Sequence, residues 1–303
     1  MISRFDVREL FLGMAILFAG SLHAQNATDF AAVKIEAQQV TDNIYMLTGS
    51  GGNLGVLTGP EGAILIDDQY AELSEKIVAA IAGLTDQPVR FLINTHWHGD
   101  HTGGNENLAK QGVVIVAHDN VRARMSKENF MASFNRTFPP SPAGALPIVT
   151  FSDNLTLHVN GEDLAVTHLK NGHTDGDSII HFLKANIIHT GDLVFNGAYP
   201  LIDVDSGGTI DGIIAAQEYI LTIANEETRI IPGHGALADK ADVQALHDVL
   251  ATVRDRVRDL KDEGKSVEQI QQAKPNADFD QTYGAGFING DRIIEFAYKS
   301  IGK

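Results

Sequence analysis

The chain has 303 residues, of which 44% are hydrophobic, and this is enough for one sizeable core or two small ones. Its formal net charge is −16, and it has no cysteine, so no disulfide holds it together. The acidic balance argues against nucleic acid or an anionic membrane surface as the main partner, because both attract clustered Lys and Arg. We therefore expect a small-molecule ligand, and the oligomeric state stays open.

The first 24 residues have the pattern of a secretory signal peptide. Two arginines precede an apolar run from Leu10 to Gly20, and 11 residues are too few to span a bilayer comfortably. A small residue then precedes the expected cut between Ala24 and Gln25. We predict a cleaved signal, export to the periplasm and no stable membrane anchor; an uncleaved anchor is the alternative.

The first half of the chain alternates short apolar strands with glycine turns. Strands are predicted at 44–48, 55–58, 63–66, 91–94 and 113–117. Helices are predicted at 71–84, where apolar residues form one stripe, and at 105–111 and 119–131. The proline-rich segment 138–144 is predicted to be a loop.

The second half begins again with strands and ends in helices. Strands are predicted at 149–151, 155–159, 164–169, 178–183, 187–189 and 229–231. Helices are predicted at 210–223, 241–261, 267–273 and 292–301. Two blocks of strands with helices indicate an α/β protein with two sheets packed face to face and helices outside. No linker divides residues 25–303, so we expect one domain. Segment 280–287 is either a lid or a linker.

The run His96-Trp97-His98-Gly99-Asp100-His101 places four potential metal ligands within six residues, directly after the predicted strand at 91–94. In an extended segment, His96 and His98 lie on one side. Asp100 and His101 follow in the turn and can reach a second, adjacent metal. Imidazoles and carboxylates are the ligands of zinc in catalytic sites, and two nearby metals can clamp a bond being hydrolysed. The run predicts a metal-dependent hydrolase.

Three later glycine turns each add one candidate ligand at the end of a predicted strand. His173 lies in the turn 171–176, Asp192 ends the turn 190–192, and His234 lies in the turn 232–235. Glycines let the backbone bend sharply and approach a site closely. Ligands are often held in this way, on loops at the edge of a rigid sheet.

The ordered motifs resemble those of the metallo-β-lactamase superfamily, from about Val33 to the C-terminal helices. The resemblance implies an αββα sandwich of two mixed sheets, with a dinuclear centre at one edge. It implies that the first metal is held by His96, His98 and His173. It implies that the second is held by Asp100, His101 and His234, with Asp192 bridging the two. Asp67 matches an acid that orients a ligand, and Asp68 is the alternative for that role.

Other candidate residues have a structural explanation beside a functional one. Six histidines lack a motif and are not predicted to be ligands: His118, His158, His168, His181, His189 and His247. Asp175 and Asp177 are interpreted as turn caps rather than as supports of a ligand. Three aromatic residues are candidates for the substrate pocket, with core packing as the alternative: Trp97, Phe195 and Tyr199.

The resemblance implies a mechanism with two zinc ions per chain, and iron or manganese are alternatives. A hydroxide held by the metals attacks an amide or ester carbonyl, and Asp100 acts in catalysis by orienting it. A β-lactamase is the leading hypothesis. The lactamases with a cysteine ligand are excluded, and Phe195 stands where they carry a lysine for the β-lactam carboxylate.

Several other functions remain as hypotheses. The position of Asp192 is more typical of glyoxalase II thioesterases, so a thioesterase or a lactonase is the alternative. A phosphodiesterase on the same fold is disfavoured by the acidic charge. An iron-dependent redox enzyme is disfavoured because its relatives carry Glu at the position of His98. A non-catalytic metal-binding protein would need closed sites, commonly with cysteine.

Overall fold

The computed structural model describes residues 28–302, so the predicted signal segment and its cut lie outside the described part. Within these residues the chain forms a sheet of seven strands, a sheet of six strands and a small hairpin. The predicted α/β sandwich is confirmed. Among residues 28–302, no helix is both long enough and apolar enough to cross a bilayer.

The first sheet is mixed and has the strand order β1-β2-β3-β4-β5-β6-β9. Its strands are β1 (Glu36–Gln39), β2 (Ile44–Thr48), β3 (Leu54–Leu57), β4 (Ala63–Ile66), β5 (Val89–Ile93), β6 (Val114–His118) and β9 (Val149–Phe151). The first four pair antiparallel, and β4, β5, β6 and β9 run parallel. The carboxyl ends of the parallel strands therefore meet at one edge.

The second sheet follows in the chain and has the order β10-β11-β12-β13-β14-β15. Its strands are β10 (Asn154–Val159), β11 (Glu162–His168), β12 (Ser178–Phe182), β13 (Ile187–His189), β14 (Arg229–Ile231) and β15 (Ala238–Asp239). Only the β13–β14 pair is parallel. The loops after β13 and β14 consequently leave the sheet on the same side.

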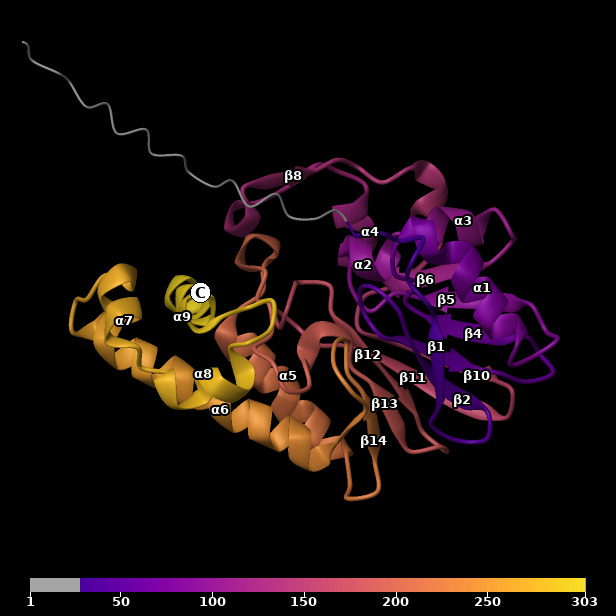
Figure 1. The fold of residues 1–303 in the computed structure, drawn as a ribbon. Helices are drawn as coiled ribbons and strands as arrows, with labels where there is room; N and C mark the ends of the chain where they lie inside the picture. The colour runs from indigo at the N-terminus through magenta and orange to yellow at the C-terminus, as the bar shows by residue number, and fades with distance from the viewer. Residues whose placement is uncertain (1–27, 303) are drawn as a thin grey trace, which may run out of the picture.

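Three apolar layers hold the sheets and helices together. One lies between the sheets, where Ile64 and Ile66 of the first sheet join Ile180 and Phe182 of the second. The outer face of the first sheet packs on α1 (Ser74–Ala82) and α3 (Asn105–Ala109). Five helices form the opposite layer: α5 (Ile210–Ile223), α6 (Lys240–Asp262), α7 (Val267–Ala273), α8 (Ala277–Tyr283) and α9 (Gly290–Ser300). Figure 1 shows helices on both outer sides.

The predicted helix at 119–131 is wrong beyond Met125. Helix α4 spans Asp119–Met125, and the chain then forms the hairpin of β7 (Asn129–Met131) and β8 (Arg136–Phe138). The Asn129 amide donates to the carbonyl oxygens of Arg124 and Lys127 and so ends the helix. Figure 1 shows β8 at the top of the molecule, above α4.

Candidate metal centre

The seven predicted ligands all lie in loops that follow strands. His96 and His98 follow β5 and precede the short helix α2 (Gly99–Thr102), which carries Asp100 and His101. His173 lies between β11 and β12. Asp192 lies in the single turn η4 (Gly191–Leu193) after β13, and His234 follows β14. Both sheets therefore contribute ligands at one edge of the sandwich.

The structure brings the seven residues together as two adjacent clusters. The first cluster consists of His96, His98, His173 and Asp192, and the second of Asp100, His101 and His234. Within each cluster, the potential ligand atoms all lie within 4.8 Å of one another. This division is the one that the sequence motifs implied, and the spacing is compatible with one metal ion per cluster.

Asp192 joins the clusters because its two carboxylate oxygens face different histidines. Oδ2 lies 3.5 Å from His173 Nε2 and 3.8 Å from His96 Nε2. Oδ1 lies 3.1 Å from His101 Nε2 and 3.4 Å from His234 Nε2. One carboxylate is thus placed between two groups of ligands, as a bridge between two metals requires.

Buried polar atoms without partners fit a metal at each cluster. Among residues 28–302, His96 Nε2, His101 Nε2 and Asp192 Oδ1 are buried and have no hydrogen-bond partner of good geometry. Burying such atoms unsatisfied is costly, and the cost is removed when they coordinate an ion. The donor set of imidazole nitrogen and carboxylate oxygen is the one that catalytic zinc takes. The residues present therefore fit two zinc ions.

Two imidazoles of the first cluster are held in their neutral form. Burial lowers the pKa of His173 to about 4, and the negative charge of Asp192 offsets this only in part. Burial together with the neighbouring charge of His101 also lowers the pKa of His96 well below its usual range. Metal ions bind the neutral form of imidazole, so these two rings are ready to coordinate at neutral pH.

The second cluster has the opposite electrostatic character. Burial disfavours the charged form of His234, but Asp192 and Asp100 outweigh it and raise its pKa to about 9. The same two carboxylates and Asp67 raise the pKa of His101. Burial raises the pKa of Asp100, but His101 and His234 outweigh it and lower that pKa to about 2. Without metal, this cluster is a set of ion pairs.

Asp67 supports a ligand in each cluster. Its Oδ2 lies 2.7 Å from His101 Nδ1, and the hydroxyl of Thr95 donates to the same oxygen at 2.7 Å. Thr95 Oγ1 lies in turn 3.0 Å from His96 Nδ1. The neighbouring Asp68 instead accepts from the Gly104 amide. The structure therefore places Asp67, and not Asp68, where it can fix the orientation of the ligand rings.

Two further supports have no signal in the sequence. Asp203 Oδ2 lies 3.0 Å from His98 Nε2, which leaves Nδ1 of that ring facing His173 Nε2 at 2.8 Å. The other nitrogen of His173 lies 2.7 Å from the carbonyl oxygen of Leu201. Both supports come from the loop after Asp192, where no motif marks them. Such outer contacts set which ring nitrogen is free for a metal.

Two glycines allow the loops to approach the ligands closely. A Cβ at Gly52 would collide with the His101 ring, and a Cβ at Gly233 would collide with Asp192 Oδ1. Both positions are therefore restricted to glycine by contact with the side chain of a predicted metal ligand. The glycine at 233 belongs to one of the turns singled out in the sequence, and close approach is the role expected of it.

The three aromatic candidates for the substrate pocket occupy different positions. The Phe195 ring lies 4.5 Å from the His234 ring, and the Trp97 ring lies 4.9 Å from that of His98. Tyr199, in contrast, is fully buried, and its hydroxyl donates to Asp280 Oδ1 at 3.1 Å. Tyr199 is therefore a core residue that anchors α8 and does not line a substrate pocket, which corrects the prediction.

The turn-cap interpretation holds for Asp177 but not for Asp175. Asp177 is buried and accepts from the Thr174 amide and hydroxyl, which is a turn cap. Asp175 forms an ion pair with Arg124 at 2.7 Å. Within residues 28–302, neither metal cluster includes any of the six other histidines: His118, His158, His168, His181, His189 and His247.

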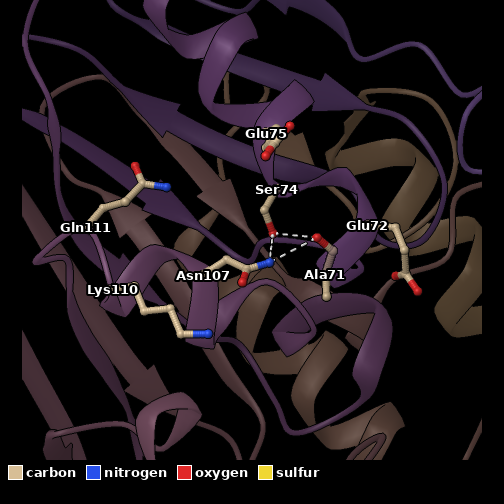
Figure 2. A pocket seen from close by; sticks show the side chains of 7 residues that line it. All are labelled: Ala71, Glu72, Ser74, Glu75, Asn107, Lys110 and Gln111. Atoms are coloured by element: carbon tan, nitrogen blue, oxygen red, sulfur yellow. Dashed lines mark hydrogen bonds between the residues drawn. The ribbon is translucent and has the colours of Figure 1, made fainter.

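A separate surface pocket lies on the outer layer, beside α1 and α3. Its volume is about 450 Å³, and it is lined by Ala71, Glu72, Ser74, Glu75, Asn107, Lys110 and Gln111. Figure 2 shows the Asn107 amide donating to the Ser74 hydroxyl and to the Ala71 carbonyl. The pocket contains none of the clustered ligands and no nucleophile that is activated by a base, so we assign it no part in the chemistry.

Comparison with known proteins agrees with this geometry. Residues 47–236 match the metallo-β-lactamase superfamily profile, which is more than half of the chain. Metallo-beta-lactamase type 2 of Bacteroides fragilis is 22% identical over 76% of this chain and 90% of its own length. The acyl-coenzyme A thioesterase MBLAC2 of Bos taurus is 24% identical over 63% of this chain and 72% of its own length.

Solved structures show the same fold at low sequence identity. The metallo-β-lactamase from Pontibacter korlensis superposes with a TM-score of 0.60 at 22% identity, over 72% of this chain and 99% of that one. The sec-alkylsulfatase Pisa1 from Pseudomonas sp. gives 0.68 at 15% identity, over 88% of this chain and 50% of that one. With its ordered ligand motifs and its two-sheet sandwich, the chain belongs to the metallo-β-lactamase superfamily of hydrolases.

Proposed function

We propose that the protein is a dinuclear zinc hydrolase that opens an amide or ester carbonyl, with β-lactams as its substrates. The observation that carries the proposal is the pair of ligand clusters joined by the two oxygens of Asp192. Each cluster supplies three protein ligands besides this carboxylate, so each zinc would take water or substrate by expanding from four to five ligands. Open positions distinguish catalytic zinc sites from structural ones.

Two zinc ions at these clusters would polarise a carbonyl oxygen and lower the pKa of water to about 7. The chain itself orients the reactants. Asp100 Oδ2 lies 3.5 Å from His234 Nε2 and 3.6 Å from His101 Nε2, and its side chain is 24% exposed. This carboxylate faces solvent at the mouth of the centre and can accept a hydrogen bond from the attacking water. His96 and His173, which are buried behind it, hold the centre rigidly.

The choice of a β-lactam rests on two arguments. The relatives over most of this chain include metallo-β-lactamases of Bacteroides fragilis and Bacillus cereus. The signal peptide that we predict for the first 24 residues would place the enzyme in the periplasm, where β-lactams act. Export and the β-lactam substrate are parts of one proposal, because a secreted enzyme encounters these compounds before their targets do.

The proposal is tested by the hydrolysis of a chromogenic cephalosporin by the zinc-loaded mature protein. We expect turnover that a chelator abolishes and that added zinc restores. The Asp100→Asn variant should bind zinc but lose about a hundredfold in turnover, because it removes a charged group that orients the reaction. A protein with two bound zinc ions and no turnover would exclude β-lactams as substrates.

A thioester or lactone is the second candidate substrate. The placement of Asp192 between the clusters favours it, because this arrangement is typical of thioesterases of the superfamily. The match to acyl-coenzyme A thioesterase MBLAC2 points the same way. An assay that detects the free thiol released from acyl thioesters, run with the same protein and chelator, distinguishes the two candidates. Turnover of thioesters in the absence of β-lactam turnover would replace the first proposal.

A further inference from the structure

His189 is a fully buried histidine at the end of β13, in the strand that leads to the turn of Asp192. Its imidazole extends to the first sheet, where Gly55 of β3 leaves room for it, since a Cβ on Gly55 would lie 3.0 Å from His189 Cδ2. Within residues 28–302, neither metal cluster includes His189. A polar group buried at this position therefore needs another explanation.

Both nitrogens of the His189 imidazole contact the backbone. Nδ1 accepts a hydrogen bond from the Gly191 amide at 3.3 Å, and Nε2 lies 3.1 Å from the carbonyl oxygen of Asn53. An amide N–H can only donate and a carbonyl oxygen can only accept, so Nε2 carries the proton and Nδ1 does not. Burial also lowers the pKa of His189 to about 4, in agreement with a neutral imidazole. His189 therefore accepts one hydrogen bond and donates one.

Two backbone hydrogen bonds close these contacts into a cycle. The Asn53 amide donates to the Gly233 carbonyl oxygen at 2.7 Å, and the Gly233 amide donates to the Gly191 carbonyl oxygen at 2.8 Å. Each of the four residues His189, Asn53, Gly233 and Gly191 thus donates one hydrogen bond within the cycle and accepts one. Hydrogen bonds that run in one direction polarise and strengthen one another. His189 is the member that contributes its side chain instead of its backbone.

The hydrogen-bond cycle connects two ligand turns of the metal centre. Gly191 directly precedes Asp192, and Gly233 directly precedes His234. Asp192 Oδ1 lies 3.4 Å from His234 Nε2, and this is the oxygen that faces the second cluster. The distance between these two side chains depends on how the two turns are held, and the cycle holds both of them.

The loop between β2 and β3 extends the same connection. The Asn53 side-chain amide donates to the carbonyl oxygens of Pro232 and Gly235, at 2.9 and 2.8 Å, which enclose the ligand histidine of that turn. The amide of the preceding residue, Gly52, donates to the Asp100 carbonyl oxygen at 3.2 Å. Through Asn53, the cycle is therefore continuous with the segment that carries the other ligands of the second cluster.

We propose that His189 is a positioning residue that, through the hydrogen-bond cycle, holds Asp192 and His234 at the separation that the second metal requires. The inference rests on the metal centre of the proposed function, and it does not depend on which bond that centre cleaves. His189 itself neither coordinates the metal nor exchanges a proton. Without it, the Gly191 amide and the Asn53 carbonyl oxygen lose their partner, and the two turns are joined only through Gly233.

The His189→Leu variant tests the proposal, because leucine fills part of the space of the imidazole but neither donates nor accepts a hydrogen bond. We expect the zinc affinity of the second cluster to fall about tenfold, as is typical when an outer contact of a metal site is removed. The first cluster should change little, because its three histidines lie outside the cycle. His189→Gln should restore part of the affinity, since an amide can accept and donate. Calorimetric titration of the metal-free proteins with zinc measures both clusters.

His118→Leu is the matched control. His118 is also buried at the end of a strand, its Nδ1 accepts from the Asn120 amide at 3.2 Å, and its Nε2 lies 2.9 Å from the Ser152 carbonyl oxygen. The control should lower the temperature of thermal unfolding, since it loses the same two kinds of hydrogen bond, but should keep the zinc affinity of both clusters. An equal loss of zinc affinity in the two leucine variants would overturn the inference, because the effect would then come from general destabilisation.

His189→Asn keeps the test decisive if His189→Leu does not fold. Asparagine places an acceptor near the position of Nδ1 but is too short to reach the Asn53 carbonyl oxygen, so it opens the cycle at one point. An unchanged zinc affinity of the second cluster in this variant would overturn the inference. Failure of the proposed function has a different signature. A wild-type protein that binds no zinc would refute the metal centre, whereas one that binds two zinc ions without cleaving a carbonyl substrate would leave the role of His189 intact.

Discussion

The two clusters of the metal centre differ in their charge before any metal binds. In the first, burial lowers the pKa of His96 and of His173, so both rings are neutral. In the second, the charges of Asp192 and Asp100 outweigh burial and raise the pKa of His101, with Asp67 contributing, and of His234. The first cluster thus contains two buried neutral imidazoles, and the second is a network of ion pairs that reaches the surface.

This difference indicates how the centre would be filled. His96 and His173 can coordinate a metal without releasing a proton, because each neutral ring already has a free nitrogen atom. The charged cluster must first release the protons of its histidines, which compensate the carboxylates while no metal is present. We therefore expect the first cluster to bind zinc more tightly and the second to depend on pH.

The largest effect is expected from His96→Ala, which removes a buried ligand of the first cluster. With only two imidazoles left beside Asp192, this cluster should lose its metal, and turnover should fall about a thousandfold. Metal content by mass spectrometry and the cephalosporin assay measure the two effects. His158→Ala is the control, because that exposed side chain pairs only with Asp163. Two metals retained in His96→Ala would contradict the assignment.

His234→Ala should have a smaller effect, because its side chain is 30% exposed and belongs to the charged cluster. We expect one tightly bound zinc to remain and turnover to fall about a hundredfold. Excess zinc should restore part of the activity, since Asp100 and His101 remain. If His234→Ala lost both metals at once, the two clusters would not be separable and the asymmetry would be wrong.

The layered fold could be predicted because its strands and helices carry regular apolar patterns. Strand β4 is buried throughout, and α1 buries Ile77 and Ile81 on one side. The elements that were missed lack such a pattern. All four residues of β1 are exposed, and α8 has no buried residue. The hairpin after α4 depends on the Asn129 side chain and on a left-handed residue, Asn135. Apolar periodicity contains none of this information.

The sequence motifs were sufficient to predict the metal ligands of the candidate site, but not the residues that support them. The ligands stand beside glycines at strand ends, and this local pattern places them. Their supports are not local, since Asp203 meets His98 across 105 residues of sequence. Thr95 directly precedes His96, but its contact with Asp67 appears only when β4 and β5 are paired. Tyr199 was wrongly predicted to line the substrate pocket, because an aromatic residue near a ligand in the sequence can face the core as well as the site.

The two clusters should also differ in how their zinc affinity depends on pH. Because the pKa of His234 in the metal-free protein is raised to about 9, this ring is protonated at neutral pH and competes with zinc. The apparent zinc affinity of the second cluster should therefore rise with pH up to about pH 9, by about tenfold per pH unit for each histidine proton that zinc displaces. The first cluster should change little over this range, since the pKa of His173 is about 4. Zinc titrations at three pH values measure the zinc affinity of both clusters.

The same pKa shift has a consequence for the stability of the metal-free protein. A histidine whose pKa is raised on folding stabilises the fold at low pH, below its unfolded value of about 6.5. That contribution is lost as the pH rises through about 9, where His234 is deprotonated. Thermal unfolding of the metal-free protein should therefore occur at a lower temperature at pH 9.5 than at pH 6.5. The His234→Ala variant should show less of this pH dependence, and an unchanged dependence would exclude His234 as its source.

The smallest effect is expected from Asp203→Asn, which supports the first cluster without being a ligand. The amide oxygen can still accept a hydrogen bond from His98 Nε2, but the negative charge that strengthens this contact is lost. We expect zinc affinity of the first cluster to fall about tenfold, as is typical for such outer contacts. The second cluster should be unaffected, because Asp67 serves His101. Competition with a chromogenic chelator measures the change.

Asp205→Asn is the control for this prediction, because it makes the same chemical change two residues away. Asp205 is exposed, and its carboxylate accepts from the Ala132 amide of the hairpin instead of from a ligand. If both variants weakened zinc binding equally, the effect would come from the charge of the loop and not from contact with His98. A decrease confined to Asp203→Asn would show that the first cluster, despite its buried rings, depends on a carboxylate to orient them, as the charged cluster depends on Asp67.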